Sequence, residues 1–234
     1  MVVLLDAGNT NMKLAYVDEL GEIVQLTIAK FYQLIDSVDK LVYGSVNDSL
    51  ELQSILTACN DNNVVLHKVS VSPNFNNLVC GYQIVENLGV DRWLALIAAR
   101  DTYSENILIV VDAGTAITID VCINDHHKGG WIAPGLSLMQ SSIIDKAPGV
   151  FSNNSITSET FGTDTPSALF HGSLFALVAM IEKAVQFANK LAPQRRSSLN
   201  IILTGGDAQI LEKHLSLKCD VNGELVFIGL KQFI

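Results

Sequence analysis

Charged residues are scarce in this chain of 234 residues: they make up 17% of it, and only 15 are lysine or arginine. The formal net charge is −9. Proteins that bind nucleic acid usually gather lysine and arginine into a basic stripe along the phosphates, and an acidic chain without one is a poor candidate. The composition therefore favours a protein whose partners are not nucleic acids.

Cysteine is also scarce, and the four cysteines, Cys59, Cys80, Cys122 and Cys219, are scattered along the chain. Their spacing shows no Cys-x-x-Cys pair of a zinc site and no disulfide framework, which is typical of a reducing cytosol. The chain starts directly with a strand pattern, without a signal-peptide pattern before it. No apolar stretch reaches the ~20 residues that span a bilayer. We therefore expect a cytoplasmic protein that does not contact a membrane.

What the chain does contain is a repeated motif at the end of two apolar runs. Residues 2–5 read as a buried strand and end in Asp6-Ala-Gly8, while residues 108–111 read as another and end in Asp112-Ala-Gly114. The two tripeptides match residue for residue, and a further strand pattern follows each. Such a repeat suggests a duplicated domain, with two facing loops and a ligand cleft between the halves.

Length and composition agree with two α/β domains. A hydrophobic fraction of 49% is enough for a sizeable core, and we place the boundary near residue 105, with domains over 1–105 and 106–234. The expected strands and helices follow from apolar periodicity, capping residues and turn signals. Strands are expected over 2–5, 12–17, 23–28, 41–43, 64–66, 108–111, 116–120, around 131–132, 201–203 and 225–228, and helices over about 49–59, 93–100, 137–144 and 165–191.

Both acid–glycine bends combine residues that suit the phosphates of a metal-bound nucleotide. In the first bend, Asp6 and Gly8 are followed by Asn9, Thr10 and Lys13. A carboxylate can hold the metal, glycine lets backbone N–H groups approach, and lysine adds a point charge. Taken alone, such a bend is explained equally well as a tight hairpin with a surface lysine.

Other polar positions have a structural interpretation beside the functional one. Asp91 fits the first turn of a helix, where the helix dipole favours negative charge, and fits a cleft edge equally well. Thr165 is expected to cap the long helix, with Pro166 at its first position. The five histidines show no ligand spacing, and His126-His127 is expected in a turn.

Together these motifs resemble the type III pantothenate kinases. The resemblance extends from residue 2 to about 230, in the order and spacing of that family. It rests on Asp6-x-Gly-Asn-Thr10-x-x-Lys13, Leu88-Gly-x-Asp91-Arg92, Asp112-x-Gly-Thr115-Ala-x-Thr118, Gly129-Gly-x-Ile132-x-Pro-Gly135 and Thr204-Gly-Gly-Asp207-Ala208. It implies the fold of the acetate kinase, sugar kinase, chaperone ATPase and actin superfamily: two ribonuclease-H-like domains with a nucleotide cleft between them.

The resemblance also implies an activity, which is ATP-dependent phosphorylation of pantothenate to 4′-phosphopantothenate, the first step of coenzyme A biosynthesis. It implies Mg²⁺ with ATP, a monovalent cation (K⁺ or NH₄⁺) and a cytoplasmic homodimer. Two alternatives stay open. One is another small-molecule kinase of the same superfamily, and the other is a nucleotide-binding accessory regulator of gene expression.

Roles for individual residues follow from the resemblance by position. Asp91 would be the catalytic base, and Asp112 would bind the monovalent cation. ATP would be bound by Asp6, Ala7, Gly8, Asn9, Thr10, Asn11, Met12, Lys13 and Thr115. Pantothenate would be bound by Tyr82, Gly89, Val90, Asp91, Arg92 and Thr165. The chain departs from the family at Val85, where many members carry a proline.

Overall fold

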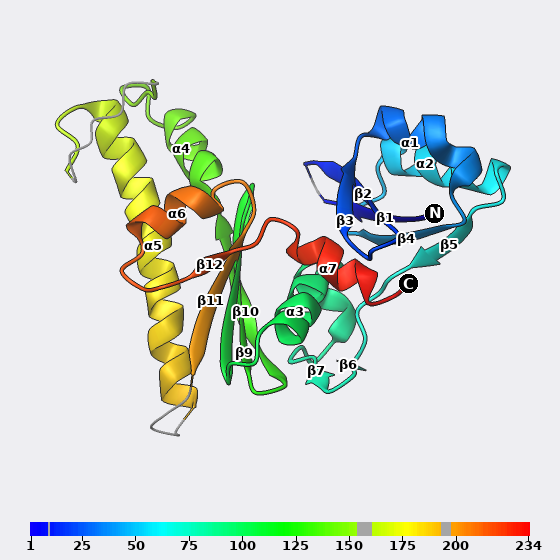
Figure 1. Cartoon of the computed structure of the whole chain (residues 1–234). Helices are drawn as coiled ribbons and strands as arrows, with labels where there is room; N and C mark the ends of the chain where they lie inside the picture. The colour runs from blue at the N-terminus through cyan, green and yellow to red at the C-terminus, as the bar shows by residue number, and fades with distance from the viewer. Residues whose placement is uncertain (9, 154–160, 193–197) are drawn as a thin grey trace. The chain divides into compact units, whose positions relative to one another are not determined.

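The chain divides into two compact units in the computed structural model, which describes residues 1–8, 10–153, 161–192 and 198–234 (Figure 1). Unit 1 comprises Met1–Thr102 and Glu224–Ile234, and unit 2 comprises Tyr103–Gly223. The expected domains over 1–105 and 106–234 stay a prediction. In the structure, however, the residues from Glu224 onward pack with the first unit and not with the second.

Unit 1 is a mixed five-stranded sheet in the order β3-β2-β1-β4-β5, with helices packed against it. β1, β2 and β3 are antiparallel neighbours, whereas β1, β4 and β5 run parallel. The strands are β1 (Val2–Ala7), β2 (Met12–Val17), β3 (Ile23–Leu26), β4 (Lys40–Ser45) and β5 (Val65–Lys68), followed by a short hairpin of β6 (Asn74–Phe75) and β7 (Leu78–Val79). The helices are α1 (Ile28–Leu34), η1 (Ile35–Ser37), α2 (Leu50–Asp61), η2 (Val85–Asn87), α3 (Val90–Thr102) and α7 (Leu225–Lys231).

Unit 2 repeats this arrangement: its five strands, which belong to a seven-stranded sheet, follow the order β10-β9-β8-β11-β12. β8, β9 and β10 are antiparallel neighbours, whereas β8, β11 and β12 run parallel. Its elements are β8 (Ile107–Ala113), β9 (Ala116–Ile123), β10 (His126–Pro134), α4 (Leu136–Ile144), α5 (Thr165–Leu191), β11 (Leu199–Thr204), α6 (Ala208–His214) and β12 (Asp220–Val221). Counted from its own first strand, each unit has the order 3-2-1-4-5, and each ends its first strand in Asp-Ala. The α/β fold is confirmed, and its topology agrees with a duplication.

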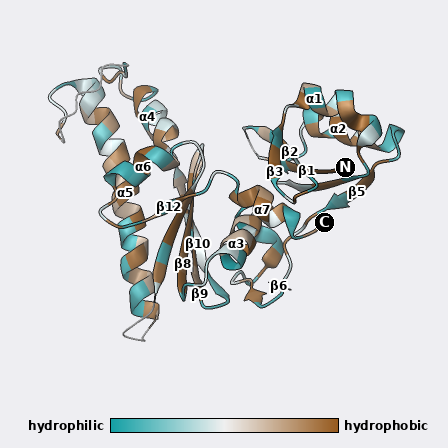
Figure 2. Cartoon of the chain, in the orientation of Figure 1, coloured by the Kyte–Doolittle hydropathy of each residue, from teal (hydrophilic) through white to brown (hydrophobic). Residues whose placement is uncertain are grey.

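Each unit has its own hydrophobic core, built on the central strands of its sheet (Figure 2). In unit 2, Ile107, Ile109 and Val111 point alternate side chains of β8 to one face, as a strand period of two requires. The facing helix α5 contributes Leu174 and Ile181, which are fully buried. Burying a side chain of this size contributes about 1.5–3 kcal/mol, so this layer accounts for much of the stability of unit 2.

Helix α5 corrects the expectation that no apolar stretch reaches the length of a membrane span. Among the described residues it is the one helix long and apolar enough to cross a bilayer, with 27 residues. Half of its most apolar window is buried inside the protein. Hydrophobic and hydrophilic residues alternate along it in Figure 2, as on a helix with one face against a sheet. We therefore interpret α5 as the core helix of unit 2.

The predicted strand over 225–228 was wrong, because these residues begin helix α7. A short apolar run does not distinguish a strand from a buried helix, and packing decides between them. Leu225, Phe227 and Leu230 are buried in unit 1. At Gly229, an added Cβ would collide with the backbone carbonyl of Leu94, so α7 packs against α3 with close backbone contact.

Adding a methyl group at Gly229 should therefore destabilise unit 1. We expect Gly229→Ala to lower the free energy of unfolding by about 1–3 kcal/mol, since the collision involves backbone and cannot be relieved by a rotamer change. Gly172→Ala is the matched control, because Gly172 is also helical but has open space at its Cβ position. It should raise stability by about 0.5–1 kcal/mol through helix propensity. Thermal unfolding of both variants checks this, and shifts of the same sign would contradict it.

The structure also corrects the predicted end of the strand over 23–28 and the predicted turn at His126-His127. The strand over 23–28 ends at Leu26, because Thr27 caps α1 and its hydroxyl accepts a hydrogen bond from the Lys30 backbone N–H at 3.2 Å. His126 and His127 lie in strand β10, and the turn before them is made by Asn124 with φ +52°. His127 is buried, with its Nε2 2.8 Å from Oδ1 of the buried Asp120 on β9, which joins the two strands.

Candidate active site

The first acid–glycine bend joins β1 to β2 in unit 1. Asp6 and Lys13 are directly paired residues of the two strands, so their side chains are neighbours on one face of the sheet. The Gly8 N–H donates to the Asn11 carbonyl at 3.1 Å, and a Cβ at position 8 would crowd the same oxygen. The bend thus places a half-buried carboxylate, an exposed ammonium and a glycine turn at one edge of the sheet.

The other residues expected at this bend differ in accessibility. Ala7 is buried in the core of unit 1, and Met12 is half-buried. Thr10 and Asn11 are exposed. Asn9 lies outside the described residues, so its expected contact with ATP stays a prediction. The backbone of this segment and the side chains of Thr10 and Lys13 are therefore the groups that a ligand could reach.

Asn47, which the sequence did not single out, connects the loop after β4 to this bend. Its Nδ2 donates to the Gly8 carbonyl at 2.8 Å, and the Val46 N–H donates to the Ala7 carbonyl at 3.1 Å. In the described part of the chain, the buried Oδ1 of Asn47 has no hydrogen-bond partner. Parallel pairing of β1 and β4 would have indicated Asn47 as a candidate site residue, because ligands bind at the carboxyl ends of parallel strands.

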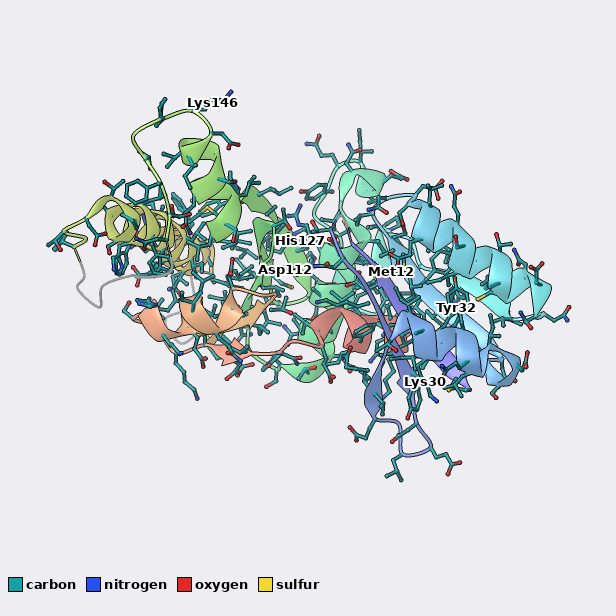
Figure 3. The ribbon with its side chains drawn as sticks, turned by 90° about the horizontal axis from the view of Figure 1, so that it is seen from above. Met12, Lys30, Tyr32, Asp112, His127 and Lys146 are labelled. Carbon is teal, nitrogen blue, oxygen red and sulfur yellow. The ribbon has the colours of Figure 1, made fainter. Side chains whose placement is uncertain are left out.

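The second acid–glycine bend lies at the end of β8 in unit 2, where Figure 3 shows Asp112. Gly205 follows β11 with φ +89°, and a Cβ there would lie 2.6 Å from Oδ1 of Asp112 and 2.5 Å from the Ala113 carbonyl oxygen. Only glycine fits this position. The space beside the carboxylate is thus free of any side chain from position 205, and carboxylate oxygens are ligands of hard cations, so Asp112 fits the expected cation.

Two further motifs meet at this second bend. The Gly135 N–H donates to the Thr115 carbonyl at 2.9 Å, and a Cβ at position 135 would collide with the Gly114 carbonyl. Burial raises the pKa of Asp207, and a hydrogen bond from the Leu136 backbone N–H partly opposes that rise. The Asp-x-Gly-Thr, Gly-Gly-x-Ile-x-Pro-Gly and Thr-Gly-Gly-Asp motifs, separate in the sequence, therefore assemble into one corner of unit 2.

The beginning of α3 brings together the expected substrate residues of unit 1. Oδ1 of Asp91 accepts a hydrogen bond from the Arg92 backbone N–H at 2.8 Å, and a Cβ at Gly89 would collide with that oxygen. Arg92 is only 6% exposed, and its Nη1 donates to the Tyr82 hydroxyl at 2.9 Å. Its guanidinium carbon lies 5.6 Å from the centre of the Tyr82 ring. The structure thus joins Tyr82 to Arg92, and Val85, the first residue of η2, lies between them in the sequence.

Thr165 is not the cap of α5, as the sequence predicted, but its first helical residue. Asp164 is the cap, and its carboxylate accepts a hydrogen bond from the Ser167 backbone N–H at 2.8 Å. The same hydrogen bond lowers the pKa of Asp164. Aspartate and threonine are both good capping residues, and the sequence alone did not decide between neighbours. The hydroxyl of the half-buried Thr165 is therefore not needed as a cap.

Two cavities open at the carboxyl ends of β4 and β5 in unit 1. The first, of about 380 Å³, reaches from Lys68 to Gly89 and Val90 at the start of α3. The second, of about 390 Å³, lies beside Asn47 and shares Ser45, Val46 and Lys68 with the first. Both volumes fall within the ~300–1,000 Å³ typical of small-molecule sites. None of Ser45, Val46 and Lys68 was among the predicted site residues.

A doubled 3-2-1-4-5 topology, with an acid–glycine bend at the first strand of each unit, is the fold of the sugar kinases and actin-like ATPases. A ROK family glucokinase from Streptomyces griseus, solved with glucose and AMPPNP, has a TM-score of 0.52 at 11% identity, covering 99% of this chain and 98% of that chain. A protein from Campylobacter jejuni, described as a Baf family transcriptional activator, has a TM-score of 0.65 at 26% identity, covering 99% and 96%.

The family model described as type III pantothenate kinase matches residues 2–186. A type III pantothenate kinase from Pseudoalteromonas translucida is 35% identical over 216 residues, which are 91% of this chain and 88% of that protein. Another, from Colwellia psychrerythraea, is 29% identical over 252 residues and covers 100% of both chains. This chain belongs to the type III pantothenate kinase family, as its motifs predicted.

Proposed function

We propose that Asp91 accepts the hydroxyl proton in the reaction of this type III pantothenate kinase, which phosphorylates pantothenate with ATP in coenzyme A biosynthesis. The observation that carries the proposal is the setting of the Asp91 carboxylate. It lies half-buried in the first turn of α3, anchored by the Arg92 N–H and given room by the missing Cβ of Gly89. A carboxylate anchored in this way has a defined position from which it could meet a substrate hydroxyl.

The chemistry of the reaction needs such a group. Transfer of a phosphoryl group to a hydroxyl requires the nucleophile in line with the γ-phosphate, cations that spread the charge, and an acceptor for the proton. Aspartate ordinarily ionises near pH ~3.9, so it is a carboxylate at neutral pH and can accept a proton as the P–O bond forms. Asp91 can therefore act without a neighbouring histidine.

The first bend is proposed to hold the phosphates of ATP. The groups would be the backbone N–H groups of residues 6–13, the Thr10 hydroxyl and the Lys13 ammonium. Mg²⁺ is usually bound through one or two carboxylates and the phosphates of the nucleotide, and Asp6 fits that need. Bound Mg²⁺ would supply charge neutralisation, while the glycine turn keeps side chains away from the phosphate oxygens.

The second bend is proposed to hold the monovalent cation at Asp112, with Thr115 contacting ATP. The support is the space beside Asp112 that Gly205 leaves free. A bound cation would supply positive charge near the nucleotide. Asp112→Asn should therefore abolish activity or raise the K⁺ or NH₄⁺ concentration needed for half-maximal turnover by about tenfold. A K⁺ titration of both proteins checks this, and equal dependence on K⁺ would contradict it.

The substrate residues are proposed to act as two groups. Tyr82 and Arg92 form a hydrogen-bonded pair whose polar groups would face pantothenate, while Gly89 and Val90 line the first cavity. Thr165, which is free from the capping role, would donate or accept a hydrogen bond through its hydroxyl. We further propose a homodimer in the cytoplasm with neither a nucleic acid nor a membrane as partner. The net charge of −9 supports the absence of a nucleic-acid partner.

Regulation of gene expression is the second candidate function, because the similar C. jejuni protein is described as a transcriptional activator. A steady-state screen separates the candidates. With ATP, Mg²⁺ and K⁺, we expect ADP release to depend on pantothenate and not on acetate or sugars. Release with a different acceptor would favour another kinase of the superfamily. If none of the acceptors tested gave ADP release, a regulator would be favoured.

A further inference from the structure

We propose that Asn47 is a positioning residue for ATP, whose side-chain amide holds the Gly8 carbonyl away from the phosphates. The inference rests on the proposed function of the first bend and adds to it a residue that acts through the backbone. Asn47 follows β4, and its Nδ2 donates a hydrogen bond to the Gly8 carbonyl at 2.8 Å. Both residues belong to unit 1.

The hydrogen bond from Asn47 extends the pairing of β1 with β4 into the bend. The two parallel strands pair as far as Ala7 and Ser45, where both strands end. Beyond this point the Val46 N–H donates to the Ala7 carbonyl at 3.1 Å. The Asn47 amide then binds the next carbonyl, that of Gly8. Two successive carbonyls of the bend are therefore held on the side of β4.

The orientation of the Gly8 carbonyl matters for an anionic ligand. Backbone binds phosphates through its N–H groups, whereas a carbonyl oxygen turned toward a phosphate repels it. A peptide group is planar and turns as one unit, and glycine adopts many backbone conformations at little steric cost. Gly8 thus gives the bend the freedom to turn its carbonyl toward the phosphates, and the hydrogen bond from Asn47 opposes that turn.

The backbone around Asn47 is itself held in place. The Ser45 hydroxyl donates a hydrogen bond to the Asn47 carbonyl. Two residues after Asn47, Ser49 caps helix α2, and its hydroxyl accepts a hydrogen bond from the Leu52 N–H at 3.2 Å. Asn47 therefore stands between two anchored points, the end of a strand and the beginning of a helix, and can transmit their position to Gly8.

The other end of the Asn47 amide supports a functional role. Its Oδ1 is buried and has no hydrogen-bond partner among the residues that the structure describes. A buried acceptor without a partner lowers stability, and a leucine of similar size would not carry that cost. Such local departures from the most stable choice are expected at functional sites. Stability alone therefore does not explain an amide at this position.

The test removes the amide without adding charge near the nucleotide. For Asn47→Leu, we expect the dissociation constant of ATP, titrated with Mg²⁺ and without pantothenate, to rise about fivefold, and the KM for ATP with it. The KM for pantothenate should change less than about twofold, and kcat at saturating ATP less than about threefold. Fivefold corresponds to about 1 kcal/mol, since tenfold is 1.4 kcal/mol, and is a reasonable effect for one hydrogen bond.

Two further variants control the experiment. Nδ2 of Asn62 also donates to a backbone carbonyl at 2.8 Å, that of Ala58 at the end of α2, so Asn62→Leu removes the same kind of hydrogen bond elsewhere in unit 1. It should leave all constants unchanged. Asn47→Ala removes the amide with a smaller side chain and should reproduce the effect of Asn47→Leu, which excludes a steric clash of leucine as its cause.

The outcomes separate this inference from the proposed function. A parent protein that does not bind ATP would overturn both. A parent that binds ATP, with Asn47→Leu and Asn47→Ala binding it as tightly as Asn62→Leu does, would overturn the role of Asn47 alone. An equal rise of the KM for ATP and for pantothenate, with a lower midpoint of thermal unfolding, would also overturn that role, because Asn47 would then only stabilise unit 1.

Discussion

Replacing Asp91 by asparagine is expected to lower kcat by about 10²–10⁴-fold, the usual contribution of a general base. Asparagine keeps the size of the side chain and can still accept the hydrogen bond from the Arg92 N–H, but it cannot take a proton. The KM for ATP should change less than about threefold, since the proposed phosphate contacts lie on the β1–β2 bend. Steady-state measurement of ADP release at saturating pantothenate gives both constants.

Asp101→Asn is the matched control for this variant. Asp101 lies near the other end of the same helix, where its Oδ2 accepts a hydrogen bond from Nε2 of Gln232 at 3.0 Å, and asparagine can still accept that bond. We expect kcat within about twofold of the parent value. If Asp91→Asn turned over as fast as Asp101→Asn, Asp91 would not be the base.

The second large effect is expected on stability, at Gly205. Gly205→Ala places a side chain at φ +89°, which costs about 1–2 kcal/mol, and crowds the Ala113 carbonyl and the Asp112 carboxylate, which costs about 1–3 kcal/mol more. The free energy of unfolding should therefore fall by about 2–5 kcal/mol. The midpoint of thermal unfolding measures the change.

The neighbouring glycine provides the control. Gly206 has open space at its Cβ position and no positive φ, so Gly206→Ala should change the free energy of unfolding by less than about 0.5 kcal/mol. If Gly205→Ala lowered the free energy of unfolding no more than Gly206→Ala does, the corner around Asp112 would be able to accommodate a side chain. Position 205 would then not require glycine.

The sequence was informative where one local signal decides the structure. The strand over residues 12–17 and the helix over about 49–59 were predicted from neighbouring residues alone. The Asp-Ala-Gly repeat indicated a duplication, and the five strands of each unit share one order. By contrast, residues 225–228 begin a helix that packs against α3, which lies far away in the sequence. Local propensity carries no information about such a partner.

The same distinction applies to the candidate site. Asp6, Asp91 and Asp112 were found because each belongs to a compact motif. Asn47 was missed because it stands in no motif, and only the parallel pairing of β4 with β1 brings it to the site. Strand order could have indicated it, since side chains at the carboxyl ends of adjacent parallel strands gather at one edge.

The most direct test of the central claim is a crystal structure of the chain with pantothenate and a non-hydrolysable ATP analogue. The account predicts that an Asp91 carboxylate oxygen lies within about 2.6–3.2 Å of the primary hydroxyl of pantothenate, the reach of a general base. It also predicts that the triphosphate contacts the bend from Asp6 to Lys13. A hydroxyl held by another side chain, with Asp91 out of reach, would contradict the account.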